Sequence, residues 1–336
     1  MNATMSLEKI KHYPVMLDQV LSIISPQHGG TFIDCTFGGG SYSKAILKFP
    51  NTKVYAIDRD KLISEKAENL KEKFPKRFSF FENKFSNLNK IIKSELEPKA
   101  IIFDLGTSSF QLSDQKRGFS FNSKNILSME MGINNFSAYD VVNSLDQQKL
   151  TSIIKILGDE KEGKIIAKSI VKHRMKKPIR TCEELNSIVR SAKKKFNHKK
   201  NPATKTFQAI RIFVNQELTE LISGLIAASK LLKNNGILLV VSFHSLEDKI
   251  VKNFFKLYSS FNQNPSRYLP EKKDKKNLFK LFSKKVQTPS QEEISENLGS
   301  RSAKLRYAIR SDSKFIYPEE IKKKFEYYFQ LEGTRI

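Results

Sequence analysis

The stretch FIDCTFGGGSYSKAIL, residues 32–47, joins a short apolar run to three consecutive glycines and then to a predicted helix. A strand, a glycine turn and a helix start together are typical of a βα unit that binds a cofactor. Two phosphate-binding patterns do not fit. No Gly-Lys-Ser/Thr follows the glycines, and the third position of Gly-x-Gly-x-x-Gly, counted from Gly38, falls on Ser43. The loop therefore favours a ligand that is not anchored by a pyrophosphate.

Two aspartates at strand ends indicate the charge of this ligand. Asp34 lies just inside the end of the first strand, where a carboxylate would repel a pyrophosphate at the helix N-terminus. Asp58 closes the next apolar run, VYAID, and a carboxylate at that place suits ribose hydroxyls. We therefore expect a nucleoside cofactor with cationic groups, such as S-adenosylmethionine. A tight turn followed by ordinary strand-end aspartates is the alternative.

The composition predicts a globular chain. Its 336 residues are 39% hydrophobic, which allows one large or two moderate domains. The longest apolar run, GILLVVSF at residues 236–243, is far shorter than the roughly 20 residues of a membrane helix, and residues 1–14 lack a signal-like apolar core. Cys35 and Cys182 are the two cysteines, and no cluster of His, Cys and carboxylate has metal-ligand spacing. We expect a cytoplasmic protein without a metal.

The net charge of +24 is concentrated in two segments. Residues 151–210 hold 16 Lys and Arg against 5 Asp and Glu, and residues 264–287 hold 8 against 2. A solvated face is the alternative for any single run, such as Lys193, Lys194 and Lys195. Concentration in two segments favours a polyanionic partner, nucleic acid in particular.

Alternating strand and helix patterns predict an α/β fold with a doubly wound parallel sheet, interrupted by an inserted all-helical domain. A long amphipathic helix is expected over residues 207–233, before the strand ILLVVSF. The expected strands are residues 31–36, 53–58, 99–106 and 237–243. The expected domains are residues 1–111 and 207–336 for the two parts of the sheet domain, 112–206 for the RNA-binding helical insert, and about 264–290 for a basic loop.

Eight blocks of sequence carry a resemblance to a known family. They are HYPVMLDQVL, DCTFGGGSYS, AIDRD, DLGTSSFQLS, RGFSF, PATKTFQAIRIFVNQEL, SFHSLEDKIVK and RSAKLR. Together they resemble the bacterial family of ribosomal RNA small subunit methyltransferase H, from about residue 10 to about residue 310. The resemblance implies a methyltransferase fold with a helical insert. It also implies methylation, with S-adenosylmethionine, of the exocyclic N4 of a cytidine in the decoding region of 16S rRNA in the small ribosomal subunit.

The resemblance also implies the residues of the cofactor site. It assigns Gly40, Ser41 and Tyr42 to the cofactor loop and Asp58 to the ribose, while Gly38 keeps the backbone of the loop approachable. Three further residues complete the site: Phe85, Asp104 and Gln111. Phe85 would lie beside the adenine, although a place in the core is the commoner fate of a phenylalanine.

Methyl transfer to cytosine N4 needs hydrogen-bond acceptors for the amine, because its lone pair is delocalised into the ring. Asp104, Ser108 and Ser109, at the carboxyl end of AIIFDLG, are the candidate catalytic residues, and an ordinary Ser-rich turn is the alternative. His244 is a further candidate, with Ser242 and Asp248 beside it. The alternative for the last group is a helix cap formed by Ser245 and Asp248.

Four residues are candidates for contacts with RNA. Gln208, Arg211 and Asn215 fall on one face of the long predicted helix, where a solvated stripe is the alternative. Arg117, within KRGFSF, is a candidate contact to a phosphate or a base.

Three other functions remain open from the sequence. A nicotinamide dehydrogenase would need the missing third glycine. A basic, non-catalytic RNA-binding assembly factor would leave Asp34, Asp58 and Asp104, at three strand ends, unexplained. A methyltransferase acting on another RNA amine shares every feature described above.

Overall fold

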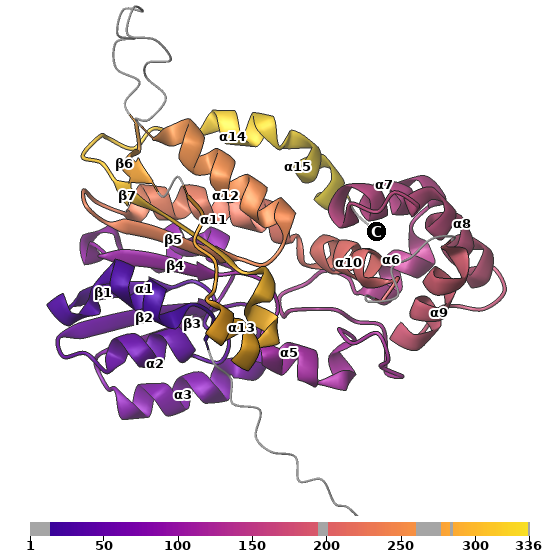
Figure 1. The fold of residues 1–336 in the computed structure, drawn as a ribbon, viewed down its shortest axis with the longest axis horizontal. Coiled ribbons are helices and arrows are strands. Elements are labelled where there is room, and N and C mark those ends of the chain that lie inside the picture. The colour runs from indigo at the N-terminus through magenta and orange to yellow at the C-terminus, as the bar shows by residue number, and fades with distance from the viewer. Residues whose placement is uncertain (1–13, 194–200, 260–276, 283–284, 335–336) are drawn as a thin grey trace, which may run out of the picture.

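The computed structural model describes residues 14–193, 201–259, 277–282 and 285–334. Its central sheet has seven strands in the order β3-β2-β1-β4-β5-β7-β6 (Figure 1). Strands β1 to β5 are parallel, and β7 is antiparallel to both β5 and β6. The strands are β1 (Gly30–Asp34), β2 (Thr52–Asp58), β3 (Phe78–Glu82), β4 (Ala100–Asp104), β5 (Ile237–Ser242), β6 (Phe279–Phe282) and β7 (Lys304–Arg310).

Helices cover both faces of this sheet, as the predicted doubly wound fold requires. Strand β4 shows why, because its apolar residues are buried on both sides: Ile102 packs into one core cluster, whereas Ile101 and Phe103 pack into the other. The first cluster includes α1 (Leu17–Ile24), α2 (Ser41–Leu47) and α3 (Ser64–Lys73). The second includes α4 (Leu88–Ile91), α11 (Glu217–Leu231) and α12 (Ser245–Tyr258).

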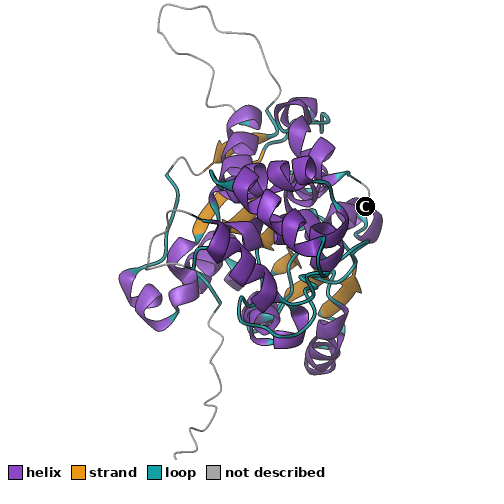
Figure 2. Cartoon of the chain, turned by 90° about the vertical axis from the view of Figure 1, so that its right-hand side faces the viewer, coloured by secondary structure: helices purple, strands orange, loops and turns teal. Residues whose placement is uncertain are grey.

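A lobe made of helices extends from one end of the sheet (Figures 1 and 2). Helix α7 packs against α8 and α10, and α9 packs against α8. The apolar core of this lobe is continuous with the core on one face of the sheet. The helices between β4 and the lobe's end are α5 (Ser109–Ser113), α6 (Ala138–Ser144), α7 (Gln147–Gly158), α8 (Gly163–Arg174), α9 (Cys182–Ala192) and α10 (Thr204–Asn215).

The single helix expected over residues 207–233 is wrong. The chain leaves the helical conformation at Gln216, whose φ of 53° is left-handed, and continues as α11 in a new direction. Helix α10 packs chiefly on α7 of the lobe, whereas α11 packs against η3 (Phe85–Asn87) and α4 beside the sheet. This packing favours a boundary of the insert at Gln216 instead of at residue 206.

The C-terminal helices extend the second face of the sheet. Helix α14 (Glu319–Lys324) packs on α12, and α15 (Glu326–Glu332) packs on α10 and α11. Glu332, the last residue of α15, accepts hydrogen bonds from the backbone nitrogens of Leu218 and Thr219, at 3.4 Å and 2.9 Å. Its carboxyl group therefore caps the start of α11. Burial raises the pKa of this carboxyl group to about 8.

Three strands were not expected from the sequence: β3, β6 and β7.

Most of the predicted basic loop, residues 264–276 and 283–284, lies outside the described residues. In the part of the chain that is described, no helix has the length and apolar character needed to cross a membrane. Helix α13 (Gln291–Glu296) and the short helix η7 (Leu298–Ser302) complete the described elements before β7.

Candidate active site

A cavity of about 550 Å³ lies where the carboxyl ends of the parallel strands meet the helical lobe. Its wall includes residues that follow β1, β2, β4 and β5, together with residues of α10. The strand order reverses between β1 and β4, which is the place where doubly wound sheets bind ligands. A cavity of this size is typical of a site for a cofactor or small molecule.

The glycine loop forms one wall of the cavity. Gly38, Gly39, Ser41 and Tyr42 line it, whereas Gly40 does not. Gly40 has a φ of 73°, and a Cβ atom on it would lie 2.7 Å from the ring of Phe37. Glycine is therefore required at this position both by the left-handed backbone and by the close approach. The prediction that Gly40 belongs to the loop holds, but its role is to shape the turn.

Asp58 ties the loop to the end of β2. Its Oδ2 atom accepts a hydrogen bond from the nitrogen of Gly38 at 2.8 Å, and its Oδ1 atom accepts one from the nitrogen of Asp60 at 2.9 Å. Burial raises the pKa of the Asp58 carboxyl group to about 6. Each oxygen keeps a second lone pair, so the group can still accept hydrogen bonds from ribose hydroxyls.

Asp34 is part of the scaffold and does not line the cavity. It is 1% exposed, and its carboxyl group accepts hydrogen bonds from the Ser43 hydroxyl at 2.7 Å and from the Thr36 nitrogen at 3.2 Å. The carboxyl group thus fixes the start of α2 relative to β1. Its charge still acts on the cavity, because it raises the pKa of Asp104.

Asp104 ends β4 and lines the cavity. Its Oδ1 atom is buried and has no hydrogen-bond partner among the described residues. Its backbone nitrogen donates to the Thr36 hydroxyl at 2.7 Å, which fixes the strand end. Burial raises the pKa of the Asp104 carboxyl group well above its usual range, and the nearby Asp34 and Glu247 raise it further. A buried acceptor without a partner is costly unless a ligand satisfies it.

Ser108 and Gln111 form a helix cap at the start of α5. The Ser108 hydroxyl accepts from the Gln111 nitrogen at 3.2 Å, and the Gln111 side-chain oxygen accepts from the Ser108 nitrogen at 3.0 Å. The Gln111 amide also donates to Asp60 at 3.0 Å. Both residues line the cavity, but these bonds hold the loop in place. Ser109 begins α5, and its side chain lies outside what the structure describes.

Two aromatic residues of the predicted cofactor site line the cavity in different ways. Phe85 meets the ring of Phe103 edge to face, with centroids 5.2 Å apart and planes at 89°. Phe85 thus lies at the cavity wall with its ring held by Phe103, and its contact with adenine stays a prediction. The Tyr42 hydroxyl donates to the carbonyl oxygen of Val15, so its polar group is already engaged within the protein.

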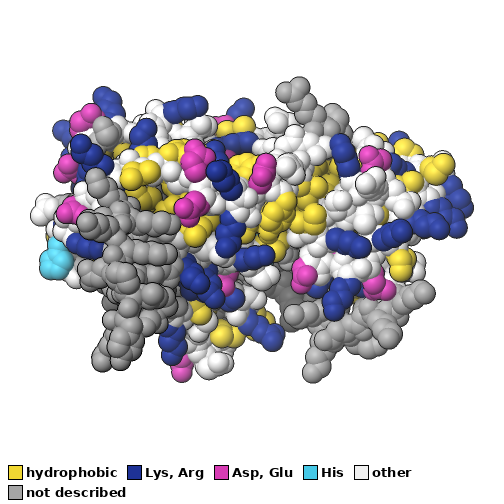
Figure 3. All heavy atoms as spheres, turned by 90° about the horizontal axis from the view of Figure 1, so that it is seen from above, with side chains coloured by type: hydrophobic (Ala, Val, Ile, Leu, Met, Phe, Trp, Pro, Cys, Tyr) yellow, Lys and Arg dark blue, Asp and Glu magenta, His cyan; other side chains and the backbone are white. Residues whose placement is uncertain are grey.

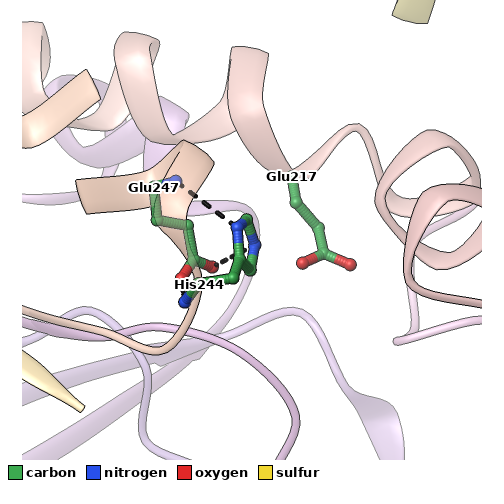
Figure 4. A group of neighbouring side chains, drawn as sticks. All are labelled: Glu217, His244 and Glu247. Carbon is green, nitrogen blue, oxygen red and sulfur yellow. Dashed lines mark hydrogen bonds and ion pairs between the residues drawn. The ribbon is translucent and has the colours of Figure 1, made fainter. Parts of the chain in front are cut away.

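His244 lies between two glutamates at the edge of the cavity (Figure 4). It is the N-cap of α12: its Nδ1 atom accepts from the Glu247 nitrogen at 3.4 Å, and Glu247 in turn accepts from the His244 nitrogen at 3.3 Å. The predicted cap formed by Ser245 and Asp248 is therefore wrong by one residue. Asp248 instead binds Arg306 and Lys304 of β7, at 2.7 Å and 3.1 Å.

The cluster that Glu217, His244 and Glu247 form was not expected from the sequence. Their potential ligand atoms lie within 4.8 Å of one another. Both oxygens of Glu217 already accept hydrogen bonds from Arg211, at 2.9 Å and 2.8 Å. The Nε2 atom of His244 lies 3.1 Å from a carboxylate oxygen of Glu247, so it already faces an acidic partner. This donor set fits an ion-pair network and does not fit a metal ion.

The charge state of Glu247 follows from the same network. Burial favours its protonated form, but His244, the Phe243 nitrogen and Arg211 outweigh burial and lower the pKa of the Glu247 carboxyl group. Glu247 is therefore ionised at neutral pH, and its charge contributes to the raised pKa of Asp104. His244 is thus engaged with Glu247, and its catalytic role stays a prediction.

The four predicted RNA contacts divide into two pairs. Gln208 and Arg211 line the cavity, and the side chain of Gln208 makes no hydrogen bond to any described residue. Arg117 and Asn215 do not line it. Arg117 is 9% exposed and binds Asp60 and the carbonyl oxygen of Glu130. Its guanidinium is engaged within the protein, which corrects the predicted phosphate contact.

Asn215 connects α10 to the segment before α6 and is fully buried. Its side chain accepts from the Met131 nitrogen at 2.9 Å and donates to the Met129 carbonyl at 2.8 Å. Arg59 makes a second connection, donating to the Asn215 carbonyl at 2.7 Å. These bonds fix the lobe against the end of β2, and they replace the RNA contact predicted for Asn215.

Comparison with known proteins gives one family. The MraW methylase family matches residues 9–311. The ribosomal RNA small subunit methyltransferase H of Wolbachia sp. subsp. Drosophila simulans (strain wRi) is 46% identical over 298 residues, which are 88% of this chain and 97% of that protein. The protein of the same name from Ehrlichia canis (strain Jake) is 46% identical over 307 residues, 89% of this chain and 99% of that one.

Solved structures resemble the chain only weakly. An rRNA methylase from Streptococcus thermophilus has a TM-score of 0.39 and 8% identity, over 87% of this chain and 96% of that one. A likeness at this level carries no argument about the site.

Proposed function

The chain belongs to the MraW methylase family, and from this premise we propose that it uses S-adenosylmethionine to methylate 16S rRNA of the small ribosomal subunit, at the exocyclic N4 of a cytidine in the decoding region. The names of the relatives support methylation of small subunit rRNA. The choice of N4 is what the resemblance to the family implies. The observation that supports an amine as the acceptor is the buried, unpartnered Oδ1 atom of Asp104 between the glycine loop and the helical lobe.

The cavity has the groups that the cofactor needs. S-adenosylmethionine, when bound, supplies an electrophilic methyl group on a positively charged sulfur. Asp58 is placed to accept hydrogen bonds from the ribose, and Phe85 offers a flat apolar surface for the adenine. The orphaned Oδ1 atom of Asp104 fits a cationic ligand, because an opposite charge would stabilise the ionised carboxylate.

The raised pKa of Asp104 suggests how the amine loses its proton. A nearby positive charge lowers the pKa of the carboxyl group, so Asp104 is ionised when the amine arrives and accepts one of its hydrogens. With S-adenosylmethionine bound, the amine nitrogen would form the new bond to the methyl carbon as the carbon–sulfur bond breaks, and the electron pair of that bond would stay on sulfur. The positive charge is then on the amine, and the proton moves to Asp104, whose pKa has risen again. Atoms and charge balance without a further reactant.

The helical lobe supplies the RNA side of this proposal. Helix α8 carries Lys164, Lys168 and Lys172 at intervals of four residues, which places them along one side of the helix, and all three are exposed. Basic side chains gather over the lobe in the space-filling view (right-hand end of Figure 3). Such a row suits the phosphates of a polynucleotide.

Lys193, from the run that the sequence singled out, has another role. Its side chain is 10% exposed and pairs with Glu160 at 2.6 Å, so it is not part of an RNA surface. The remaining residues of that run, Lys194 and Lys195, lie outside the described residues.

The nucleosides of small subunit rRNA from cells with and without this gene test the proposal. We expect N4-methylated cytidine to decrease when the gene is absent. Loss of a methyl group from another RNA amine would support methylation of the small subunit but contradict the choice of N4. An unchanged set of modified nucleosides would contradict the whole proposal.

A further inference from the structure

A second cavity, of about 280 Å³, lies beside the main one. Phe243 and His244 line both cavities, so the loop between β5 and α12 forms the wall between them. The opposite side of the second cavity consists of residues 301–304, at the end of η7 and the start of β7. The two cavities are therefore neighbours that share this loop.

The second cavity is lined by hydrogen-bond donors. Its polar lining residues are Ser245, Thr288, Arg301, Ser302 and Lys304, with His244 at the shared wall. Arg301 is exposed, and none of the ion pairs or hydrogen bonds among the described residues engages its side chain. A guanidinium beside several hydroxyl groups is a donor set that matches the oxygens of a phosphate.

The acidic groups near this cavity already have partners within the protein. Asp248 binds Lys304 at 3.1 Å and Arg306 at 2.7 Å. Glu247 accepts hydrogen bonds from the backbone nitrogens of Phe243 and His244, at 2.9 Å and 3.3 Å. Lys304 is therefore paired, whereas Arg301 is the cation of the cavity lining that has no partner among the described residues. Ser245 also begins α12, a helix of 14 residues, whose positive end adds to the attraction for an anion.

We propose that this second cavity binds a backbone phosphate of the RNA next to the nucleotide that is methylated, with Arg301 as its main cation. The inference rests on the proposed function, which places the acceptor base in the main cavity. A phosphate held across Phe243 and His244 fixes the register of the strand without reading its sequence. The contact therefore contributes to affinity for RNA and to placing the base, but not to cofactor binding.

The test compares Arg301→Gln with the wild type and with two further variants. Arg301→Lys keeps the positive charge. Lys53→Gln removes one exposed positive charge from the start of β2, at the opposite end of the strands from the cavities. Binding of each protein to small ribosomal subunits is measured over a range of salt concentrations, and binding of S-adenosylmethionine is measured separately.

We expect Arg301→Gln to weaken RNA binding by about threefold or more at low salt. A plot of log affinity against log salt should become less steep by about 0.7 to 0.9, which is the contribution of one phosphate contact. Arg301→Lys and Lys53→Gln should keep the wild-type slope, and all variants should bind S-adenosylmethionine normally. The inference is overturned if Arg301→Gln keeps the slope of Lys53→Gln, or if it loses cofactor affinity. A wild type that neither binds nor methylates small subunits would instead overturn the proposed function.

Discussion

The Oδ2 atom of Asp58 accepts a hydrogen bond from the backbone nitrogen of Gly38 at 2.8 Å, so the end of β2 holds the loop that follows β1. Replacing Asp58 with alanine removes this bond as well as the acceptor for the ribose. We expect S-adenosylmethionine to bind more than tenfold more weakly, because a hydrogen bond to a charged group contributes about 1.5 to 3 kcal/mol. Calorimetry on the folded variant measures the change.

The matched control is Glu82→Ala. Glu82 is an exposed carboxylate at the end of β3, and it does not line the cavity. Its replacement should leave cofactor affinity unchanged. If Asp58→Ala behaved like Glu82→Ala, the cofactor would not lie at the end of β2.

Asp104 should make cofactor binding depend on pH. Burial raises the pKa of the Asp104 carboxyl group well above its usual range, so a bound cation favours the loss of its proton. The affinity of the wild type for S-adenosylmethionine should therefore rise with pH through this raised pKa. Asp104→Asn cannot ionise and should lack this rise. Identical pH profiles for the two proteins would show that Asp104 does not face the cationic group.

The same variant tests the chemical step. Asp104→Asn keeps the shape of the side chain but cannot take a proton from the amine. We expect turnover to fall by about a hundredfold or more, which corresponds to roughly 2.7 kcal/mol. Single-turnover rates at saturating cofactor separate a loss in the chemical step from a loss in binding. Wild-type turnover in Asp104→Asn would rule out this residue.

The exposed lysines of α8 should bind RNA phosphates. Replacing Lys164, Lys168 and Lys172 with glutamine should weaken binding to small subunits and lower the salt slope by about 2 to 3, since each phosphate contact contributes about 0.7 to 0.9. Cofactor affinity should not change. The control variant replaces three exposed lysines near the sheet with glutamine and so removes the same charge: Lys48, Lys53 and Lys76. If the salt slope stays the same, the three lysines of α8 are exposed to solvent and do not bind RNA.

Glu332 should make stability depend on pH. Its pKa is raised from 4.5 to about 8 in the folded chain, so its contribution to the free energy of unfolding is fully present below about pH 4.5 and is lost as pH rises through about 8. Glu332→Gln cannot ionise, so its free energy of unfolding should fall less than that of the wild type when the pH rises from 5 to 8. The difference between the two losses should be on the order of a few kcal/mol. Chemical denaturation at both pH values measures this.

Glu319→Gln provides the comparison, because Glu319 is exposed at the start of α14. It should follow the wild-type pH dependence. A wild type and Glu332→Gln that lose equal stability over this range would contradict the raised pKa of Glu332 in the folded chain.

The sequence predicted the parallel strands because each is a continuous apolar run between turn signals, as in AIIFD of β4. Strand β7 was missed because KLRYAIR carries buried charges. Arg306 pairs with Asp248, and Arg310 donates to several carbonyl groups, so both can be buried. Partners so far away in the sequence cannot be read from a local pattern.

The break at Gln216 was missed because the apolar period of α10 continues into α11.

The candidate site was predicted best where a motif fixes the local backbone. The glycine loop, Asp58 and Asp104 all meet at the cavity. Arg117 was misjudged because its partner Asp60 is 57 residues away in the chain. Glu247 was missed although SFHSLED carries the spacing of a capping box, since the sequence offers two frames, His244 with Glu247 and Ser245 with Asp248. The structure selects the first.

Methyl transfer to a defined atom of RNA is the central claim, and it can be measured directly. Purified protein is incubated with methyl-labelled S-adenosylmethionine and small ribosomal subunits that lack the modification, and the labelled nucleoside and its position are identified. We predict label on N4 of one cytidine in the decoding region of 16S rRNA, and much less of it with Asp104→Asn. Label on a ring carbon, on a ribose oxygen or on protein, or no label in the wild type, would contradict the account.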